Sequence, residues 1–147
     1  MSAIVLTNAY VQLQDTGSGT TWDISDFVTG ITLSTSHELI ETTQMNDVYR
    51  RMIAGLGQNQ VTFEFNQDFE SVVNASVGGL ESVIYPFIGT TLRCRVRPVN
   101  AAVSAINPQY RFDMVISEWT PLSASVGELS TAVVTWPITG EITKTTT

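Results

Sequence analysis

The side chains that most often carry out catalysis are scarce in this sequence. His37 is the only histidine and Cys94 the only cysteine among 147 residues. Nucleophilic catalysis needs a nucleophile beside a base, and a zinc site needs several histidine or cysteine ligands at short spacing. Neither pattern is present, and no glycine-rich phosphate loop leads into a helix. We therefore expect no catalytic residues, no metal site and no cofactor, and we do not expect an enzyme.

Three arginines on one strand are a sharper feature. Arg93, Arg95 and Arg97 alternate with apolar residues, so one face of an extended segment is basic. Such a strip either binds a phosphate or an acidic partner, or it pairs across strands with acids such as Asp113 or with a neighbouring subunit. The chain has 14 acidic and 7 basic residues. We therefore favour charge pairing, between strands or between subunits, for these four residues.

A second basic group lies in the segment from about residue 42 to 57. This segment is long for a hairpin connection, which usually has about 2–5 residues. It combines tyrosine, methionine and arginine, the residues in which interface cores are enriched. A loop that packs back onto its own domain is the alternative. As a subunit-interface loop, its predicted contact residues are Thr42, Met45, Asp47, Tyr49, Arg50, Arg51, Met52 and Ile53.

The elements that position these groups are mostly strands. Apolar and polar residues alternate in Gln60–Asn66, Leu92–Arg97 and Tyr110–Ile116, which indicates sheets with one buried face. Between Phe69 and Ile88 the apolar residues instead recur every three or four positions. We predict one mainly β domain over residues 1–147, a two-layer antiparallel β-sandwich or barrel. One flanking α-helix at about 69–88 and the long loop at about 42–57 complete it.

Composition limits the classes of partner. The net charge is −7, which disfavours strong binding to nucleic acid because phosphate binding needs clustered lysine and arginine. No apolar run is long enough for a transmembrane helix, so we expect no membrane partner. A lone cysteine and an N-terminus without a signal pattern favour synthesis in a reducing cytoplasm.

Several short motifs follow one another in a particular order over about residues 30–143. They are Glu41-Thr42-Thr43, Asn46-Asp47-x-x-Arg50-x-x-x-x-Gly55-Leu56, the strand Gln60–Phe65, Asn107-Pro108, Trp119-Thr120-Pro121, Gly127-Glu128 and Pro137-x-x-Gly140-x-Ile142-Thr143. This order resembles that of the major tail (tail tube) proteins of long-tailed bacteriophages.

The resemblance implies a structural virion protein that self-assembles as stacked hexameric rings. The rings form the tail tube, through which double-stranded DNA passes without specific binding. It implies that the long loop contacts an adjacent subunit or the next ring. The other implied partners are the tape measure, the terminator and the baseplate or tip proteins. The protein would reside in the virion tail after synthesis in the host bacterial cytoplasm.

A tube for DNA needs a bore without basic side chains, because each well-placed lysine or arginine adds a phosphate contact. The polar face of one strand meets this requirement, and its residues are possible lumen-facing residues: Gln60, Thr62, Glu64 and Asn66. The arginine strand is expected to face away from the bore.

Two other functions fit the same composition. A monomeric β-sandwich binding module for a carbohydrate or receptor could present Trp22, Trp119 or Trp136 as an aromatic platform. Another virion part, such as a tail terminator or a capsid decoration protein, is the second alternative.

Overall fold

The computed structural model describes residues 8–67, 72–74, 77–78 and 83–147. Nearly all of the regular structure in this part of the chain is β-strand. The helical residues are Val83 and Ile84, which are α-helical, and the short 3-10 helix η1 (Tyr85–Phe87) that follows them. The strands are β1 (Tyr10–Gln14), β2 (Thr21–Asp23), β3 (Val28–Glu41), β4 (Met52–Asn66), β5 (Val72–Asn74), β6 (Val77–Gly78), β7 (Thr91–Arg97), β8 (Gln109–Val115) and β9 (Thr131–Thr145).

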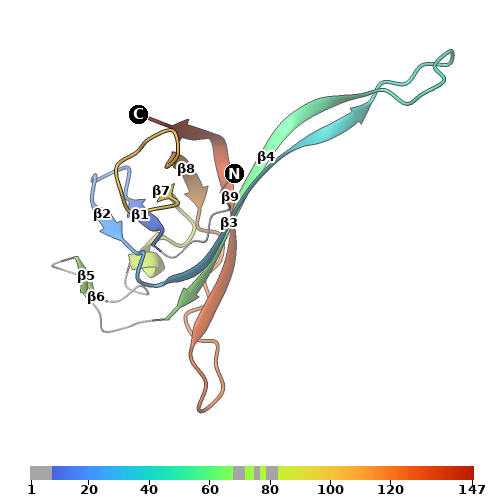
Figure 1. Ribbon diagram of the computed structural model, residues 1–147. Coiled ribbons are helices and arrows are strands. Elements are labelled where there is room, and N and C mark those ends of the chain that lie inside the picture. The colour runs from blue at the N-terminus through green and yellow to red at the C-terminus, as the bar shows by residue number, and fades with distance from the viewer. Residues whose placement is uncertain (1–7, 68–71, 75–76, 79–82) are drawn as a thin grey trace.

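Seven strands form one antiparallel sheet in the order β2-β1-β7-β8-β9-β4-β3 (Figure 1). Strand β9 joins its two halves: residues 131–138 pair with β4, and residues 138–145 pair mainly with β8. The register with β8 shifts between Arg111 and Asp113, and nearby Gly140 has a φ of 87°, a conformation that favours glycine. A strand that passes from one layer to another through such an irregularity makes the corner of a sandwich. The sheet therefore bends over its own core at β9.

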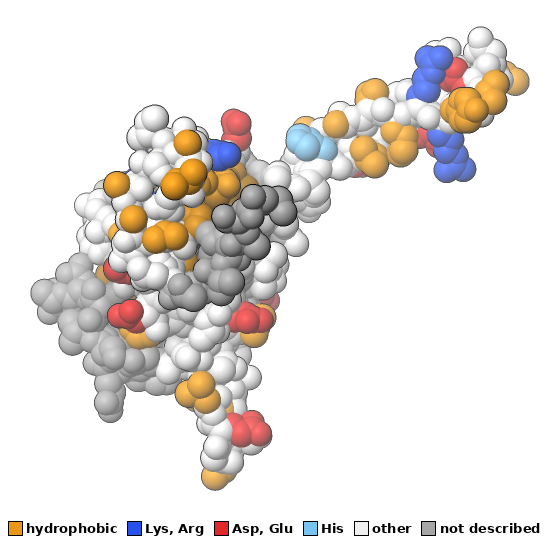
Figure 2. Space-filling model, in the orientation of Figure 1, with side chains coloured by type: hydrophobic (Ala, Val, Ile, Leu, Met, Phe, Trp, Pro, Cys, Tyr) orange, Lys and Arg blue, Asp and Glu red, His pale blue; other side chains and the backbone are white. Residues whose placement is uncertain are grey.

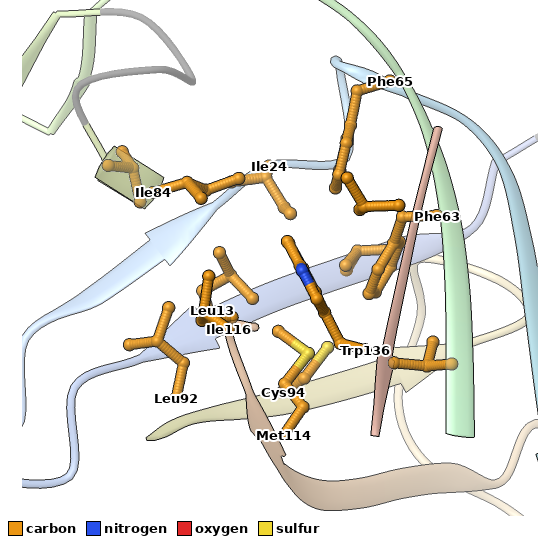
Figure 3. Packing of buried hydrophobic residues seen from close by; sticks show 14 of the residues in the cluster. Leu13, Ile24, Phe63, Phe65, Ile84, Leu92, Cys94, Met114, Ile116 and Trp136 are labelled. Atoms are coloured by element: carbon orange, nitrogen blue, oxygen red, sulfur yellow. The ribbon is translucent and has the colours of Figure 1, made fainter. Parts of the chain in front are cut away.

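The core lies between the two halves of this bent sheet. In Figure 3 the indole of Trp136 lies among Phe63 from β4, Leu13 from β1 and Cys94 from β7. All four side chains are fully buried. The indole N–H of Trp136 donates a hydrogen bond of 2.8 Å to a backbone carbonyl, so its single polar group is satisfied. Period-two alternation explains these contacts, since every second residue of each strand faces inward.

The predicted mainly β fold is confirmed, but the seven strands belong to a single sheet that is not closed into a barrel. The hydrogen-bonded order ends at β2 and β3, which do not pair with each other. The barrel alternative is therefore wrong. The two layers are two halves of one continuous sheet.

The helix predicted over about 69–88 is contradicted at residues 72–74 and 77–78 and agrees with the structure only at residues 83–87. Within the described residues of that range, Val72–Asn74 and Val77–Gly78 are strands that pair with each other, whereas Val83 and Ile84 are α-helical and Tyr85–Phe87 is a 3-10 turn. Valines restrict χ1 in a helix, and glycine disfavours helix by about 1 kcal/mol relative to alanine. These propensities outweigh the apolar spacing. The remainder of the predicted helix, residues 69–71, 75–76 and 79–82, lies outside the described residues.

Candidate assembly surfaces

The hairpin of β3 and β4 extends far beyond the rest of the sheet (Figure 1). We call its outer part, residues 38–56, the arm. Leu39 pairs with Ala54, Ile40 with Ile53, and Glu41 with Met52. The segment predicted as a loop at about 42–57 is therefore strand from Met52 onward, and the connection between the strands is limited to residues 42–51. The predicted loop was too long because glycines in β4 interrupt the alternation of apolar and polar residues that marks a strand.

A bulge at the root of the arm depends on those glycines. The register shifts between His37 and Leu39, where β4 uses one residue more than β3. A Cβ atom on Gly55 would lie 3.0 Å from Cδ1 of Ile40, and one on Gly57 would lie 3.1 Å from Cε1 of His37. Glycine therefore permits a close approach of the two strands at this point. Bulges bend a strand and change its direction, so this one sets the angle at which the arm leaves the body.

The tip of the arm is ordered by its own hydrogen bonds. The backbone N–H of Thr42 donates to the carbonyl of Arg51 at 2.8 Å, and the N–H of Arg51 donates to Oγ1 of Thr43 at 2.9 Å. The carboxylate of Asp47 accepts a bond of 2.8 Å from the N–H of Gln44 and pairs with Arg51 at 2.9 Å. A preorganised tip loses less conformational entropy when it binds a partner.

Apolar side chains lie on both faces of the arm. Ile40 and Ile53 face one side as a directly opposed pair, whereas Leu39 and Met52 face the other. A two-stranded ribbon has no interior in which to bury them. Figure 2 shows these hydrophobic groups along the arm, with charged groups near its tip. The exposed large apolar residues of the arm are Leu39, Ile40, Met45, Val48, Tyr49, Met52, Ile53 and Leu56.

The predicted interface residues all lie on the outer half of the arm. Tyr49 is 84% exposed and Met45 fully exposed. Arg50 makes only a loose ion pair of 3.8 Å with Glu41, and such exposed pairs contribute about 0–1 kcal/mol. Sequence reasoning missed Leu39, Ile40 and Leu56, because their exposure follows from the absence of any covering element.

The predicted lumen residues lie together on the outer face of β4. Val61, Phe63 and Phe65 point into the core, so the residues between them point outward. The adjoining positions on β3 and β9 are also uncharged, and Thr62 shares a hydrogen bond of 3.0 Å with Thr135 across the strands. Glu64 is the only charged side chain on this outer face among the described residues. The residues of the face are Thr32, Ser34, Gln60, Thr62, Glu64, Asn66, Thr131, Val133, Thr135 and Pro137.

The arginines of β7 lie on the outer face of the other half of the sheet. The Nε of Arg93 donates to Oδ1 of Asp113 at 2.9 Å, and this hydrogen bond, with the charge of Asp113, raises the pKa of Arg93. Arg95 donates to a glutamine at 2.6 Å, and Arg97 lies 4.2 Å from the centroid of the Tyr10 ring. The structure thus pairs Asp113 with Arg93 and places the other two arginines against neutral groups.

A groove of about 860 Å³ opens at the root of the arm, between the two halves of the sheet. Apolar side chains form much of its wall, among them Ile31, Leu33, Val96, Tyr110, Ile138 and Ile142. His37 borders it, but its Nδ1 faces the carbonyl oxygen of Gly55 at 3.3 Å and no nucleophile. Its apolar wall is suited to packing against apolar side chains.

The side chains that could take part in catalysis or metal binding do not lie together in the described residues. Cys94 is fully buried, and burial raises the pKa of its thiol well above the usual value. In the described ranges, no cluster of three or more histidine, cysteine, aspartate or glutamate residues could hold a metal ion.

Trp22 and Trp136 are buried and Trp119 packs against the core, so they do not form the aromatic platform suggested for a glycan-binding module. In the described part of the chain, no helix is long and apolar enough to span a bilayer.

No protein-family model matches the sequence, and no curated protein sequence matches it. Solved structures do. A chain from the virion of a native gene transfer agent particle superposes with a TM-score of 0.69 at 11% identity, covering 97% of this chain and 99% of that one. A chain from the tail of an empty gene transfer agent particle, refined with C6 symmetry, gives 0.65 at 15% identity with the same coverage.

A third match comes from a baseplate. A chain from the six-fold symmetrised baseplate of the anti-feeding prophage gives a TM-score of 0.59 at 12% identity, covering 99% of this chain and 98% of that one. These identities are low, so the matches establish the fold. The fold is the one found in phage-like tail particles, which confirms the predicted resemblance to tail tube proteins at that level.

Proposed function

We propose that this chain is a structural protein of a phage-like tail, whose copies form stacked hexameric rings. The rings make a tube that conducts double-stranded DNA. One observation carries the proposal. The chain has a fold shared with chains of tail particles, and its arm exposes apolar side chains that the rest of the molecule does not cover. The chain is proposed to act in the virion tail and to have no catalytic role.

The open edge of the sheet supports assembly from identical copies. Strand β3 is at the end of the sheet, so one side of its 14 residues has no strand partner among the described residues. Edge strands are usually protected by lysine, proline or a bulge that twists them away. Val28–Glu41 contains no lysine and no proline, and between its two register irregularities, at Val28/Gly30 and His37/Leu39, the strand pairs regularly with β4 and has no bulge. An edge that pairs with the neighbouring subunit needs no such protection, and head-to-tail contacts of this kind form a ring when the rotation between subunits closes.

The outer face of β3, β4 and β9, whose charged side chain is the acid Glu64, is suited to the bore. Three strands from each of six subunits, spaced about 4.8 Å and tilted about 40°, close at a backbone diameter of about 36 Å. Side chains reduce this to a bore of roughly 25 Å, wide enough for a DNA duplex. Glu64 repels phosphate, and the face has no lysine or arginine among the described residues. DNA therefore slides along it without being held.

The two ends of the molecule support stacking. The arm projects at one end, and the loop between β8 and β9 projects at the other (Figure 1). Leu122, Val126 and Leu129 in this loop are exposed, as are the apolar groups at the tip of the arm. Contact between the arm of one ring and the body of the next would bury both groups. The tape measure, terminator and baseplate or tip proteins are the remaining proposed partners.

The likeness to a baseplate chain favours a second candidate, a single ring at the end of a tail. This alternative uses the same lateral contacts, but not the stacking contact. Electron microscopy of the purified chain separates the two, because a stacking protein forms tubes of variable length and a terminal ring does not.

A precise removal of the arm tests the proposal. His37 and Gly57 are directly opposite each other, so Glu38–Leu56 can be replaced by an Asn-Gly turn that closes a two-residue hairpin. We expect the full-length chain to form rings and tubes at high concentration. The shortened chain should remain a folded monomer with an unchanged core, as measured by sedimentation and by tryptophan fluorescence, since all three tryptophans lie in or against the core.

Two outcomes would contradict different parts of the proposal. A shortened chain that still forms normal tubes would show that the arm is not an assembly element. A full-length chain that stays monomeric at the highest attainable concentration would contradict the proposal that copies of the chain form a tube.

A further inference from the structure

Four of the seven basic residues of the chain share one sheet face. Arg93, Arg95 and Arg97 on β7 point outward, and the register of β8 places Arg111 directly opposite Arg95. Like charges at directly opposed positions destabilise a sheet. Nothing in the sequence pattern alone reveals this pairing, because it depends on which residues of two separate strands meet. We call these four residues the arginine face.

One acid within the described part of the chain pairs with this face. Asp113 pairs with Arg93, whereas the closest polar partners of Arg95 are the neutral side chains of Gln12 and Gln14. Arg111 is exposed and makes no hydrogen bond or ion pair with the described residues. The four arginines and Asp113 together carry a charge of +3, in a chain whose net charge is −7.

The surroundings of Arg95 confirm that this surface is electropositive. Its pKa is lowered, first because burial disfavours the charged guanidinium and then because Arg93 and Arg111 are close. The chain thus keeps like charges together on a partly buried surface, with the cost that directly opposed like charges carry in a sheet. A surface that carries such a cost is typical of a binding site.

We propose that the arginine face binds an extended acidic segment of a second protein. Alternate residues of β7 are about 6.8 Å apart, the same repeat as alternate side chains of another extended strand. Carboxylates at every second position of such a segment would therefore meet successive arginines. Each guanidinium offers a planar pair of donors that fits one carboxylate. In the proposed tube this face points away from the bore, where a partner outside the tube reaches it.

A peptide fits this face better than nucleic acid does. A duplex would extend beyond the arginine face onto a surface that, excluding the face, carries a charge of −10, because −7 less +3 is −10. Repulsion acts over a Debye length of about 10 Å at 0.1 M salt. A short acidic segment covers the arginines alone and avoids that repulsion.

The test uses a fluorescent peptide of about ten residues with alternating glutamate and threonine, at about 50 mM salt, where surface charges are weakly screened. The double variant Arg95→Gln and Arg111→Gln should bind it at least about tenfold more weakly than the natural chain. The matched control is Arg50→Gln with Arg51→Gln, which removes the same charge from the tip of the arm. It should change the affinity less than about twofold, because screening limits distant charges.

Three outcomes would overturn the inference. They are equal binding of a peptide with glutamine in place of glutamate, equal loss in the control, and tighter binding of a short DNA duplex than of the peptide. Thermal unfolding shows whether the variants are folded, and the exposed single variant Arg111→Gln replaces the double variant if that one is not. The peptide binding can also be measured on the arm-deleted chain, which lacks the control positions Arg50 and Arg51 but keeps the arginine face, so the result does not depend on the tube.

Discussion

Removing the apolar pair of the arm should weaken assembly without weakening the fold. Ile40 and Ile53 face each other across the two strands and are 45% and 54% exposed. Fully burying an isoleucine side chain stabilises by about 1.5–3 kcal/mol, so burying the exposed half contributes about 1 kcal/mol each. The double variant Ile40→Ser and Ile53→Ser should therefore lose about 2 kcal/mol of assembly free energy per subunit, which raises the critical concentration about thirtyfold.

The assay pellets the polymer over a series of total concentrations and measures the protein that stays in the supernatant. The matched control is Val133→Ser, since Val133 is 60% exposed on the face proposed to line the bore. That variant should shift the critical concentration less than about twofold, because in the proposed tube the side chain of Val133 faces the bore and contacts no neighbouring subunit. Unfolding by urea at a concentration below assembly should differ by no more than about 0.5 kcal/mol for either variant. An unchanged critical concentration in the double variant would refute the reasoning, as would an equal shift in the control.

Three further predictions concern the fold and its charges. Trp136→Ala should lower the free energy of unfolding by about 3–5 kcal/mol, measured in urea, because a fully buried aromatic side chain leaves a cavity; a loss below about 1 kcal/mol would contradict the core described above. Gly140→Ala should destabilise by about 1–2 kcal/mol because its φ is 87°, whereas Gly17→Ala, at a position without positive φ, should be close to neutral. The hydrogen bond from Ser18 lowers the pKa of Asp15, so its stabilising effect is complete above the ordinary pKa and is lost as pH falls through the lowered value. Carboxyl chemical shifts should show the pKa of Asp15 rising in Ser18→Ala, and an unchanged midpoint would exclude that bond as the cause.

The buried strands were predictable because their pattern is local. Val61, Phe63 and Phe65 alternate with polar residues, and all three are buried. A period of two is set by the backbone and needs no knowledge of the neighbouring strand. The same locality explains why the polar face of β4 could be recognised from the sequence.

Features that depend on distant partners were not predictable. The strand from Met52 to Gly57 is held by its pairing with β3, and Gly55 within it conceals the pattern. Valines spaced three and four apart indicated a helix, yet Val72–Asn74 and Val77–Gly78 pair as strands. The opposition of Arg95 and Arg111 follows only from the register between β7 and β8.

Electron cryomicroscopy of the purified chain at high concentration tests the central claim most directly. The account predicts a hollow tube with six subunits in each ring, whose bore is lined by Gln60, Thr62 and Glu64 and whose arms contact other subunits. A population of single folded molecules would contradict it, and so would a tube with Arg95 and Arg111 in the bore.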